Sequence, residues 1–363
     1  MPSPTAWPGG SDVTLPVVVH ILWHQPMENI PDEQVFSQLD ALNQDFQALN
    51  AETASVPTIF QPLVASVGFS FCLASTDPDG LPTSGITRTY TDNPIGIGGT
   101  PNIHYDALGG KDAWEPDRYI NIWVARFAGG VGGTATFPGQ AVPAEDGIEI
   151  DFRQFGTLGT APPYHLGRTL THEMGHYFNL HHLWGPAFDS CCDEDDFVSD
   201  TPLSCETYLD ACPLSSSFPI SCTEPDLYMN FMNFTDDACM ALFTPGQRDR
   251  MWAALQQNRS SLMDSDGCQP VHVDDAAAGI SSDGPFLLQN PVRDRLTVAG
   301  FRPQPKQMVT VRLLHPGGLE IAREFLPLHK ELMVDVSFLP AGMYWLTVTG
   351  TDVSYQFGFV RLP

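Results

Sequence analysis

Residues 171–182 read Thr-His-Glu-Met-Gly-His-Tyr-Phe-Asn-Leu-His-His. Residues 171–180 of this segment belong to a stretch, 167–180, whose spacing predicts a helix. In a helix His172 and His176 are four residues apart, so they lie on one face. Two imidazoles placed this way can bind one Zn²⁺ at about 2.0–2.1 Å. Glu173 follows the first ligand, where its carboxylate can reach a zinc-bound water and act as general base.

His182 is the third candidate ligand, six residues after His176. A continuing helix would carry it off the ligand face, so we expect a sharp turn near residue 179. Asn tolerates the left-handed backbone of such a turn better than other residues except Gly, which suits Asn179. Three His ligands leave the fourth position open, as in catalytic rather than structural zinc sites. The alternative is a helix whose histidines lie at the surface and bind no metal. His181 is expected to point away from the metal.

The histidine motif resembles the signature of the metzincin zinc peptidases, H-E-x-x-H-x-x-[GN]-x-x-H. The wider sequence is more similar to the pappalysin branch, over residues 14–262. The matching segments are 15–23, 79–88, 184–185, 198–202, 228–239 and 243–247. The resemblance implies an α+β fold: a metzincin-type catalytic domain with a twisted mixed sheet, a backing helix, an active-site helix and an irregular lower subdomain.

The resemblance also implies roles for residues outside the histidine motif. Met232 is expected to be the Met-turn, an apolar floor beneath the zinc, and Asp200 and Thr201 are expected to lie near a structural Ca²⁺. A merely solvated acidic loop is the alternative at 189–200. Two disulfides are implied, Cys192–Cys222 and Cys212–Cys239, and we expect Cys191 to pair with Cys205.

The sequence departs from the family at two places. Relatives often carry Tyr two residues after the Met-turn, where its hydroxyl can assist the oxyanion, but Phe234 stands here. An acid in the S1′ pocket gives this branch its preference for basic residues. Asp236 or Asp237 are candidates, yet Ala238 is a candidate for the key place, so the sequence predicts no cleavage preference.

Cysteine usage and charge bear on location and partners. Six of the eight cysteines lie between 191 and 239, in a loop-rich stretch, which indicates disulfides and an oxidising compartment. The rival, a Cys-rich zinc site, lacks paired C-x-x-C elements. The net charge of −26 disfavours nucleic acid as a partner. No apolar run is long enough to span a membrane, and residues 1–12 show no signal peptide.

Charge also divides the chain. Residues 285–363 hold 8 basic and 6 acidic residues, and the rest holds 9 basic and 37 acidic ones. We expect a catalytic domain over 1–265, a linker over 266–284 and a small all-β sandwich over 285–363. The predicted strands of the first domain are 15–23, 67–73, 119–125 and 147–152, and its helices are 31–50, 167–180 and 244–262. The predicted strands of the sandwich are 293–299, 307–314, 331–336, 343–349 and 354–361.

The C-terminal segment resembles the type A sorting domain of type IX secretion cargo, through residues 289–292 and 339–346. This implies a bacterial protein that is secreted or held at the cell surface and that contacts the secretion machinery through this domain. The usual basic tail is reduced to Arg361. The alternative is an ordinary β-sandwich accessory domain.

Together these features predict a secreted zinc-dependent endopeptidase acting on proteins or peptides. Glu173 would take a proton from the attacking water and pass it to the leaving amine. An extended substrate would pair with an upper edge strand near 147–152. Two rivals stay open: a surface-displayed, non-enzymatic binding module with structural zinc, and a zinc hydrolase acting on non-peptide amides or esters.

Overall fold

The computed structural model describes residues 12–81, 83–186, 192–209, 212–213, 218–268, 285–287, 292–301, 307–314, 320–340, 342–350 and 354–361. The chain divides into two compact units, Met1–Gln269 and Pro270–Pro363. The predicted domain bounds of 1–265, 266–284 and 285–363 stay a prediction, because residues 269–284 lie outside the described part.

The first unit is built on a six-stranded sheet in the order β2-β1-β4-β6-β5, with β3 also paired to β1. Strand β1 pairs in parallel with β2, β3 and β4, and β5 is antiparallel to β6. The sheet is therefore mixed, as predicted. Its strands are β1 (Val13–Trp23), β2 (Phe69–Leu73), β3 (Ile86–Tyr90), β4 (Ile120–Ala125), β5 (Gly133–Ala135) and β6 (Ile148–Asp151).

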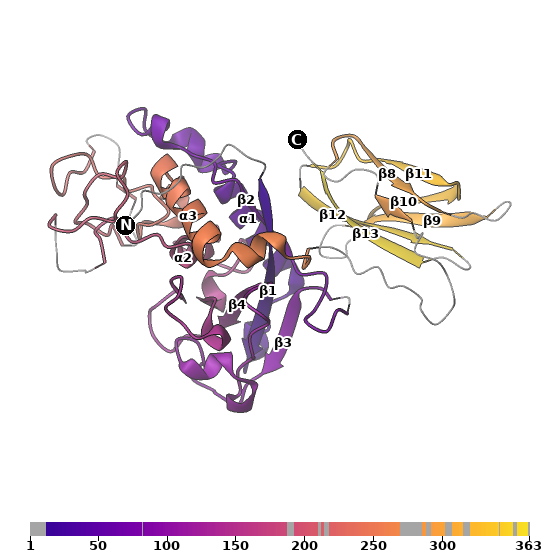
Figure 1. Ribbon diagram of the computed structural model, residues 1–363, viewed down its shortest axis with the longest axis horizontal. Coiled ribbons are helices and arrows are strands. Elements are labelled where there is room, and N and C mark those ends of the chain that lie inside the picture. Colours follow the sequence, from indigo (N-terminus) through magenta and orange to yellow (C-terminus); the bar gives the residue numbers. More distant parts are fainter. Residues whose placement is uncertain are drawn as a thin grey trace. The chain divides into compact units, whose positions relative to one another are not determined.

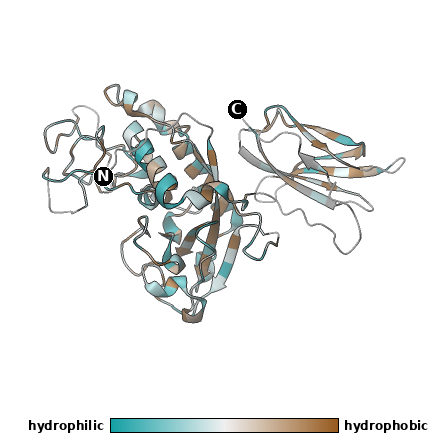
Figure 2. Ribbon diagram, viewed as in Figure 1, coloured by the Kyte–Doolittle hydropathy of each residue, from teal (hydrophilic) through white to brown (hydrophobic). Residues whose placement is uncertain are grey.

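Three helices accompany this sheet: α1 (Asp32–Phe46), α2 (Arg168–Tyr177) and α3 (Pro245–Asn258) (Figure 1). Both faces of β1 are buried, since its odd-numbered and even-numbered side chains enter different apolar clusters. The odd face, from Leu15 to Ile21, packs with apolar residues of all three helices. Figure 2 shows hydrophobic residues along the strands of the sheet. Burial on both faces explains why β1 reads as an unbroken apolar run.

The predicted helices begin within one residue of the expected positions, but all three end earlier. Helix α2 stops at Tyr177 instead of 180. Helix α1 stops at Phe46, and Ala48 adopts a left-handed backbone with φ 53°. Helix α3 ends at Asn258 and is followed by a short 3-10 helix over Ser260–Asp264. These are local endings that hydrophobic spacing does not register.

One strand prediction is wrong in its place within the sheet. The segment predicted at 147–152 forms β6, but β6 lies between β4 and β5 and is no edge strand. The edge is β5 (Gly133–Ala135), a strand absent from the sequence-based prediction because it is short and follows a glycine-rich run. Strand β3 was also missed, since its side chains are half exposed and show no apolar alternation.

The second unit is all β, as predicted. One sheet has the order β10-β9-β12-β13 and the other β11-β8-β7, and their inward residues form one apolar cluster. Strand β9 alternates buried Val309, Val311 and Leu313 with more exposed residues. The strands are β7 (Phe286–Leu287), β8 (Arg295–Ala299), β9 (Met308–Leu314), β10 (Glu320–Pro327), β11 (Glu331–Asp335), β12 (Gly342–Thr349) and β13 (Ser354–Arg361). The sequence did not predict β7 and β10.

Candidate active site

Helix α2 carries the histidine motif and ends in the predicted turn. Asn179 has φ 74°, and its amide donates to the carbonyl of His176 at 2.8 Å. The amide of Leu180 donates to the carbonyl of Gly175 at 2.9 Å, which closes the helix end. The left-handed residue reverses the chain and brings His182 back beside α2. The prediction that Asn179 makes this turn is confirmed.

The three predicted ligands meet at one point. The Nε2 atom of His182 lies 3.2 Å from His172 Nε2 and 3.0 Å from His176 Nε2. One ligand atom from each residue falls within 4.8 Å of the others, and among the described residues this is the only such group of His, Cys, Asp or Glu. His181 stands apart, stacked on Phe137 with ring centroids 5.1 Å apart.

The orientation of the imidazoles tests whether a cation fits between them. His172 Nδ1 lies 2.7 Å from the carbonyl oxygen of Phe231, and His176 Nδ1 lies 2.7 Å from that of Leu180. A carbonyl only accepts, so both Nδ1 atoms carry the proton and both Nε2 atoms present bare lone pairs. Metal-binding histidines are held in this way. Two lone pairs converging on His182 Nε2 fit a cation such as Zn²⁺ at their centre.

Burial keeps these rings neutral. It lowers the pKa of His172 to about 4 and that of His176 well below its usual 6.5. The pKa of His182 is lowered as well, first by burial and then by the neighbouring imidazoles. Neutral imidazole is the form that binds zinc.

Glu173 lies on α2 beside the ligands and is 7% exposed. Burial raises its pKa to about 8, and the charge of Glu149 adds to this shift. A cation next to the carboxylate opposes the shift and favours the ionised form. A Cβ placed on Gly133 would meet Glu173 Cγ at 2.9 Å, so edge strand β5 passes directly over this side chain.

Met232, the expected Met-turn residue, lies fully buried against α2. A Cβ on Gly175 would come within 2.5 Å of the Met232 sulfur. The backbone amide of Met232 donates to Asn230 Oδ1 at 2.9 Å, and the Asn230 and Gln247 side-chain amides bond to each other at 2.7 and 2.9 Å. This amide pair ties the turn to the start of α3.

Aromatic rings enclose the histidines. Trp184 stacks on His182 with centroids 4.6 Å apart. Phe234 lies edge-on to His182 at 4.9 Å and near His172 at 5.4 Å. Phe234 therefore makes apolar contact with two of the three histidines and has no hydroxyl to donate. Sequence reasoning missed Trp184 as a ring against the third ligand.

Asp200 and Thr201, the two residues expected near calcium, form hydrogen bonds to two different parts of the chain. Asp200 accepts from Thr244 Oγ1 at 2.6 Å and from the amide of Gly246 at 2.8 Å, at the N-terminus of α3. The Thr201 hydroxyl contacts both carboxylate oxygens of buried Asp196 at 2.8 and 2.9 Å. Burial raises the pKa of Asp196 to about 8. Asp196 is a buried acid in this loop that the sequence analysis did not single out, and the calcium expectation at Asp200 and Thr201 stays a prediction.

The acids after the Met-turn are also placed. Asp237 is 1% exposed and its Oδ2 accepts from the amides of Leu166 at 2.7 Å and Arg168 at 3.4 Å, which fixes the start of α2. Asp236 Oδ1 is buried and has no hydrogen-bond partner among the described residues. Ala238 is exposed.

Disulfides join Cys192 to Cys222 and Cys212 to Cys239, the two pairs that the resemblance implies. Cys191 lies outside the described residues, so the expected pair of Cys191 with Cys205 is not tested. A further disulfide joins Cys72 to Cys268, 196 residues apart. No local spacing signals a pair so distant in sequence.

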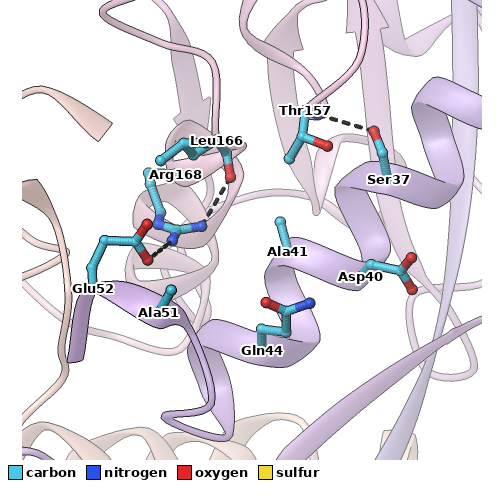
Figure 3. A pocket seen from close by; sticks show the side chains of 9 residues that line it. All are labelled: Ser37, Asp40, Ala41, Gln44, Ala51, Glu52, Thr157, Leu166 and Arg168. Atoms are coloured by element: carbon cyan, nitrogen blue, oxygen red, sulfur yellow. Dashed lines mark hydrogen bonds and ion pairs between the residues drawn. The ribbon is translucent and has the colours of Figure 1, made fainter. Parts of the chain in front are cut away.

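A cavity of about 290 Å³ lies away from the histidines, between α1 and the segment before α2 (Figure 3). At its wall the Arg168 guanidinium donates to Glu52 at 2.7 Å and to the carbonyl of Leu166 at 2.9 Å. Thr157 donates its amide to Ser37 at 2.9 Å. The Arg168 contacts anchor the first turn of α2. None of the residues that line the cavity belongs to the cluster of three histidines.

The chain is similar to known metallopeptidases. The sequence model of the M43 peptidase family, described as pregnancy-associated plasma protein-A, matches residues 105–256. An extracellular metalloprotease of Arthroderma benhamiae is 28% identical over 260 residues, which cover 67% of this chain and 79% of the relative. An extracellular metalloprotease of Podospora anserina is 30% identical over 213 residues, which cover 56% of this chain and 66% of the relative.

A solved structure also matches. Mature mirolysin of Tannerella forsythia, in complex with a cleaved peptide, is 38% identical with a TM-score of 0.64. The match covers 70% of this chain and 96% of mirolysin. Separately, no helix of the described residues is long and apolar enough to cross a membrane.

Proposed function

This chain belongs to the M43, or pappalysin, family of metallopeptidases, and from that premise we propose that it is a secreted zinc endopeptidase whose general base is Glu173. The single observation that carries the proposal is the convergence of three neutral imidazoles beside a buried carboxyl group. Only three ligands gather among the described residues. That number favours a catalytic zinc over the closed four-ligand site of a structural one.

His172, His176 and His182 would hold the metal through their Nε2 atoms. Zinc, when bound, lowers the pKa of water and polarises a carbonyl oxygen, and it is the oxyanion stabiliser that we assign, because Phe234 has no donor. The carbonyls of Phe231 and Leu180 keep two of the rings oriented and increase their basicity.

Glu173 performs the proton transfers. Its carboxylate takes a proton from the attacking water and then gives the same proton to the leaving amine. A single carboxyl group suits both steps because the pKa of Glu173 is raised by burial and lowered again by a nearby cation.

The substrate would bind as an extended strand along β5. This strand ends the sheet order, so its outer edge has no strand partner among the described residues. Backbone pairing on such an edge is a common mode of peptide recognition. The close approach of Gly133 to Glu173 would then bring the bound backbone next to the base.

Three finer proposals concern the setting of the enzyme. The disulfides and the extracellular relatives support secretion, and we propose that the C-terminal β unit is a type IX sorting domain in a bacterial cell. We also propose that Ca²⁺ binds near Asp200 and Thr201, in the loop that also contains buried Asp196. A buried carboxyl group beside further acids suits that cation.

Metal analysis and product mapping test the proposed function. We expect one zinc per chain, lost in His182→Ala, and internal cleavage products when a protein substrate is digested and sequenced by mass spectrometry. A zinc-loaded protein that cleaves esters or small amides but no peptide would contradict it in favour of the non-peptide hydrolase. Zinc that a chelator cannot remove from the folded chain would favour the binding module.

A further inference from the structure

Arg259 lies just beyond the end of α3 and is buried, with 7% of its surface exposed. Its guanidinium forms two hydrogen bonds to the Asp146 carboxylate, at 2.5 and 2.9 Å. Its Nε donates to the carbonyl of Tyr177 at 3.2 Å, and its Cζ lies 3.5 Å above the centre of the Tyr177 ring. Tyr177 is the last residue of α2. Arg259 thus joins the end of the zinc-binding helix to the segment that contains Asp146.

That segment is the hairpin loop between β5 and β6. Asp146 accepts a hydrogen bond from Thr136 Oγ1 at 2.7 Å, and Arg259 Nη2 lies 3.4 Å from the carbonyl of Thr136. Thr136 directly follows β5, and its amide donates to the carbonyl of Gly147 at 3.0 Å. The Gly147 amide returns a bond to Thr136 Oγ1 at 2.9 Å. The two ends of the hairpin loop, at Thr136 and at Asp146 and Gly147, are therefore bonded to each other, and Arg259 is bonded to Asp146.

Phe137 carries this restraint to the metal ligands. It follows Thr136, and its ring lies 5.2 Å from the His176 ring and 5.1 Å from the His181 ring, centroid to centroid. On the other side of Thr136, strand β5 runs over Glu173 through Gly133. One short stretch of chain thus contacts both the base and a ligand, and its position depends on the loop that Arg259 holds.

The chemistry of the contact requires an arginine. A guanidinium is planar and engages a carboxylate with two parallel bonds, whereas an ammonium acts as a point charge. Breaking a buried pair leaves a charge without compensation, so the loop is expected to shift when either partner is replaced. The Arg259–Asp146 pair fixes an orientation as well as a distance.

We propose that Arg259 is a positioning residue that sets the β5–β6 hairpin against α2, so that an extended substrate bound on β5 reaches Glu173 in register. The inference rests on the proposed function, because it concerns the edge on which the substrate would pair. Its signature is dependence on substrate length, because only a peptide that extends along β5 uses the hairpin.

The test compares a quenched octapeptide with a short blocked peptide that spans only the cleaved bond and its neighbours. For Arg259→Lys we expect kcat/KM to fall about 100-fold on the octapeptide and less than about threefold on the short peptide. Asp146→Asn should give the same pattern, and the double variant should be no worse than either single one, since both changes break one contact. Zinc content should stay at the wild-type level.

Arg118→Lys is the matched control. Arg118 pairs with Asp266 at 2.8 Å, in a more exposed site away from the hairpin, and both substrates should be cleaved at wild-type rates. If Arg259→Lys does not fold, Thr136→Val keeps the shape of the side chain, removes its bond to Asp146 and should show the same length dependence. An equal loss of kcat/KM on both peptides, or no loss in zinc-loaded variants, would overturn this inference and leave the proposed function intact. A zinc-loaded wild type that cleaves neither peptide would overturn the proposed function and this inference with it.

Discussion

Gly133 on edge strand β5 lies against Glu173 on helix α2, with no room for a side chain between them. A Cβ at residue 133 would lie 2.9 Å from Glu173 Cγ and 2.8 Å from Ile150 Cδ1. These two atoms belong to the side chains of Glu173 and of Ile150 on the neighbouring strand β6. Any residue larger than glycine must therefore displace one of the two side chains. The glycine therefore fixes how closely edge strand β5 approaches the Glu173 side chain.

Gly133→Ala should lower kcat/KM for peptides about 100-fold, because displacement of a catalytic group by about 1 Å is enough for that loss. Zinc content and the circular dichroism spectrum should not change. Gly130→Ala is the control, since a Cβ there meets nothing within 4 Å. Equal activity of the two variants would show that the approach of β5 to Glu173 is unimportant.

Met232→Ala should lower the free energy of unfolding by about 2–5 kcal/mol, the range for deleting a buried Met side chain. Met232 is fully buried and its sulfur lies against Gly175 of the zinc-binding helix, so zinc affinity should fall as well. Urea denaturation and zinc titration measure the two effects. Met27→Ala, at a residue 68% exposed, should leave both unchanged. A Met232→Ala protein as stable as that control would contradict the packing described here.

Sequence and structure agree best where the signal is local. The zinc helix, the turn at Asn179 and the buried strand β1 each depend on a few neighbouring residues, and all three were predicted. The edge strand was assigned to 147–152 instead of β5, because strand order depends on pairing across the whole sheet. A three-residue strand after a glycine-rich run also leaves no alternation to detect.

Long-range pairs explain the other omissions. The contact between Arg259 and Asp146 and the Cys72–Cys268 disulfide join residues more than 100 positions apart. The Asp200 carboxylate accepts a hydrogen bond from Thr244 at the N-terminus of α3, 44 residues further along, and the sequence did not predict this contact. The residues next to Asp200 in the sequence give no sign that Thr244 and Gly246 are its hydrogen-bond partners in the folded chain.

His20 should make the first unit less stable in acid. Burial lowers its pKa from 6.5 to about 4, and its Nε2 lies 3.1 Å from Asn121 Oδ1. Between pH 6.5 and 4, His20 is protonated in the unfolded chain but stays neutral in the folded chain. The contribution of His20 to the free energy of unfolding is therefore complete above pH 6.5 and is lost as the pH falls through this window. The loss is on the order of 3 kcal/mol.

Urea denaturation between pH 4 and 7 checks this expectation. His20→Gln should reduce the pH dependence of the free energy of unfolding, while His329→Gln, at an exposed residue of the second unit, should not. His172, His176 and His182 also reduce stability in acid, because burial lowers the pKa of each, but their contribution cancels when variant and wild type are compared. Parallel curves for wild type and His20→Gln would show that His20 titrates normally in the folded chain.

The Cys72–Cys268 disulfide should stabilise the first unit by about 2–5 kcal/mol. It links β2 to the end of that unit, where the amide of Ser75 also donates to the carbonyl of Gly267 at 2.8 Å. The double variant Cys72→Ser, Cys268→Ser should unfold at a lower temperature and still bind zinc, because neither residue contacts the metal site. Loss of zinc in the folded double variant would contradict this separation.

The most direct test of the zinc peptidase assignment is the rate of casein hydrolysis by wild type and Glu173→Gln at equal zinc occupancy, each with and without o-phenanthroline. We expect that the wild type cleaves casein, that the chelator stops cleavage and added zinc restores it, and that Glu173→Gln is about 10²–10⁴-fold slower. Cleavage by Glu173→Gln at the wild-type rate, or cleavage that persists in the chelator, would contradict it.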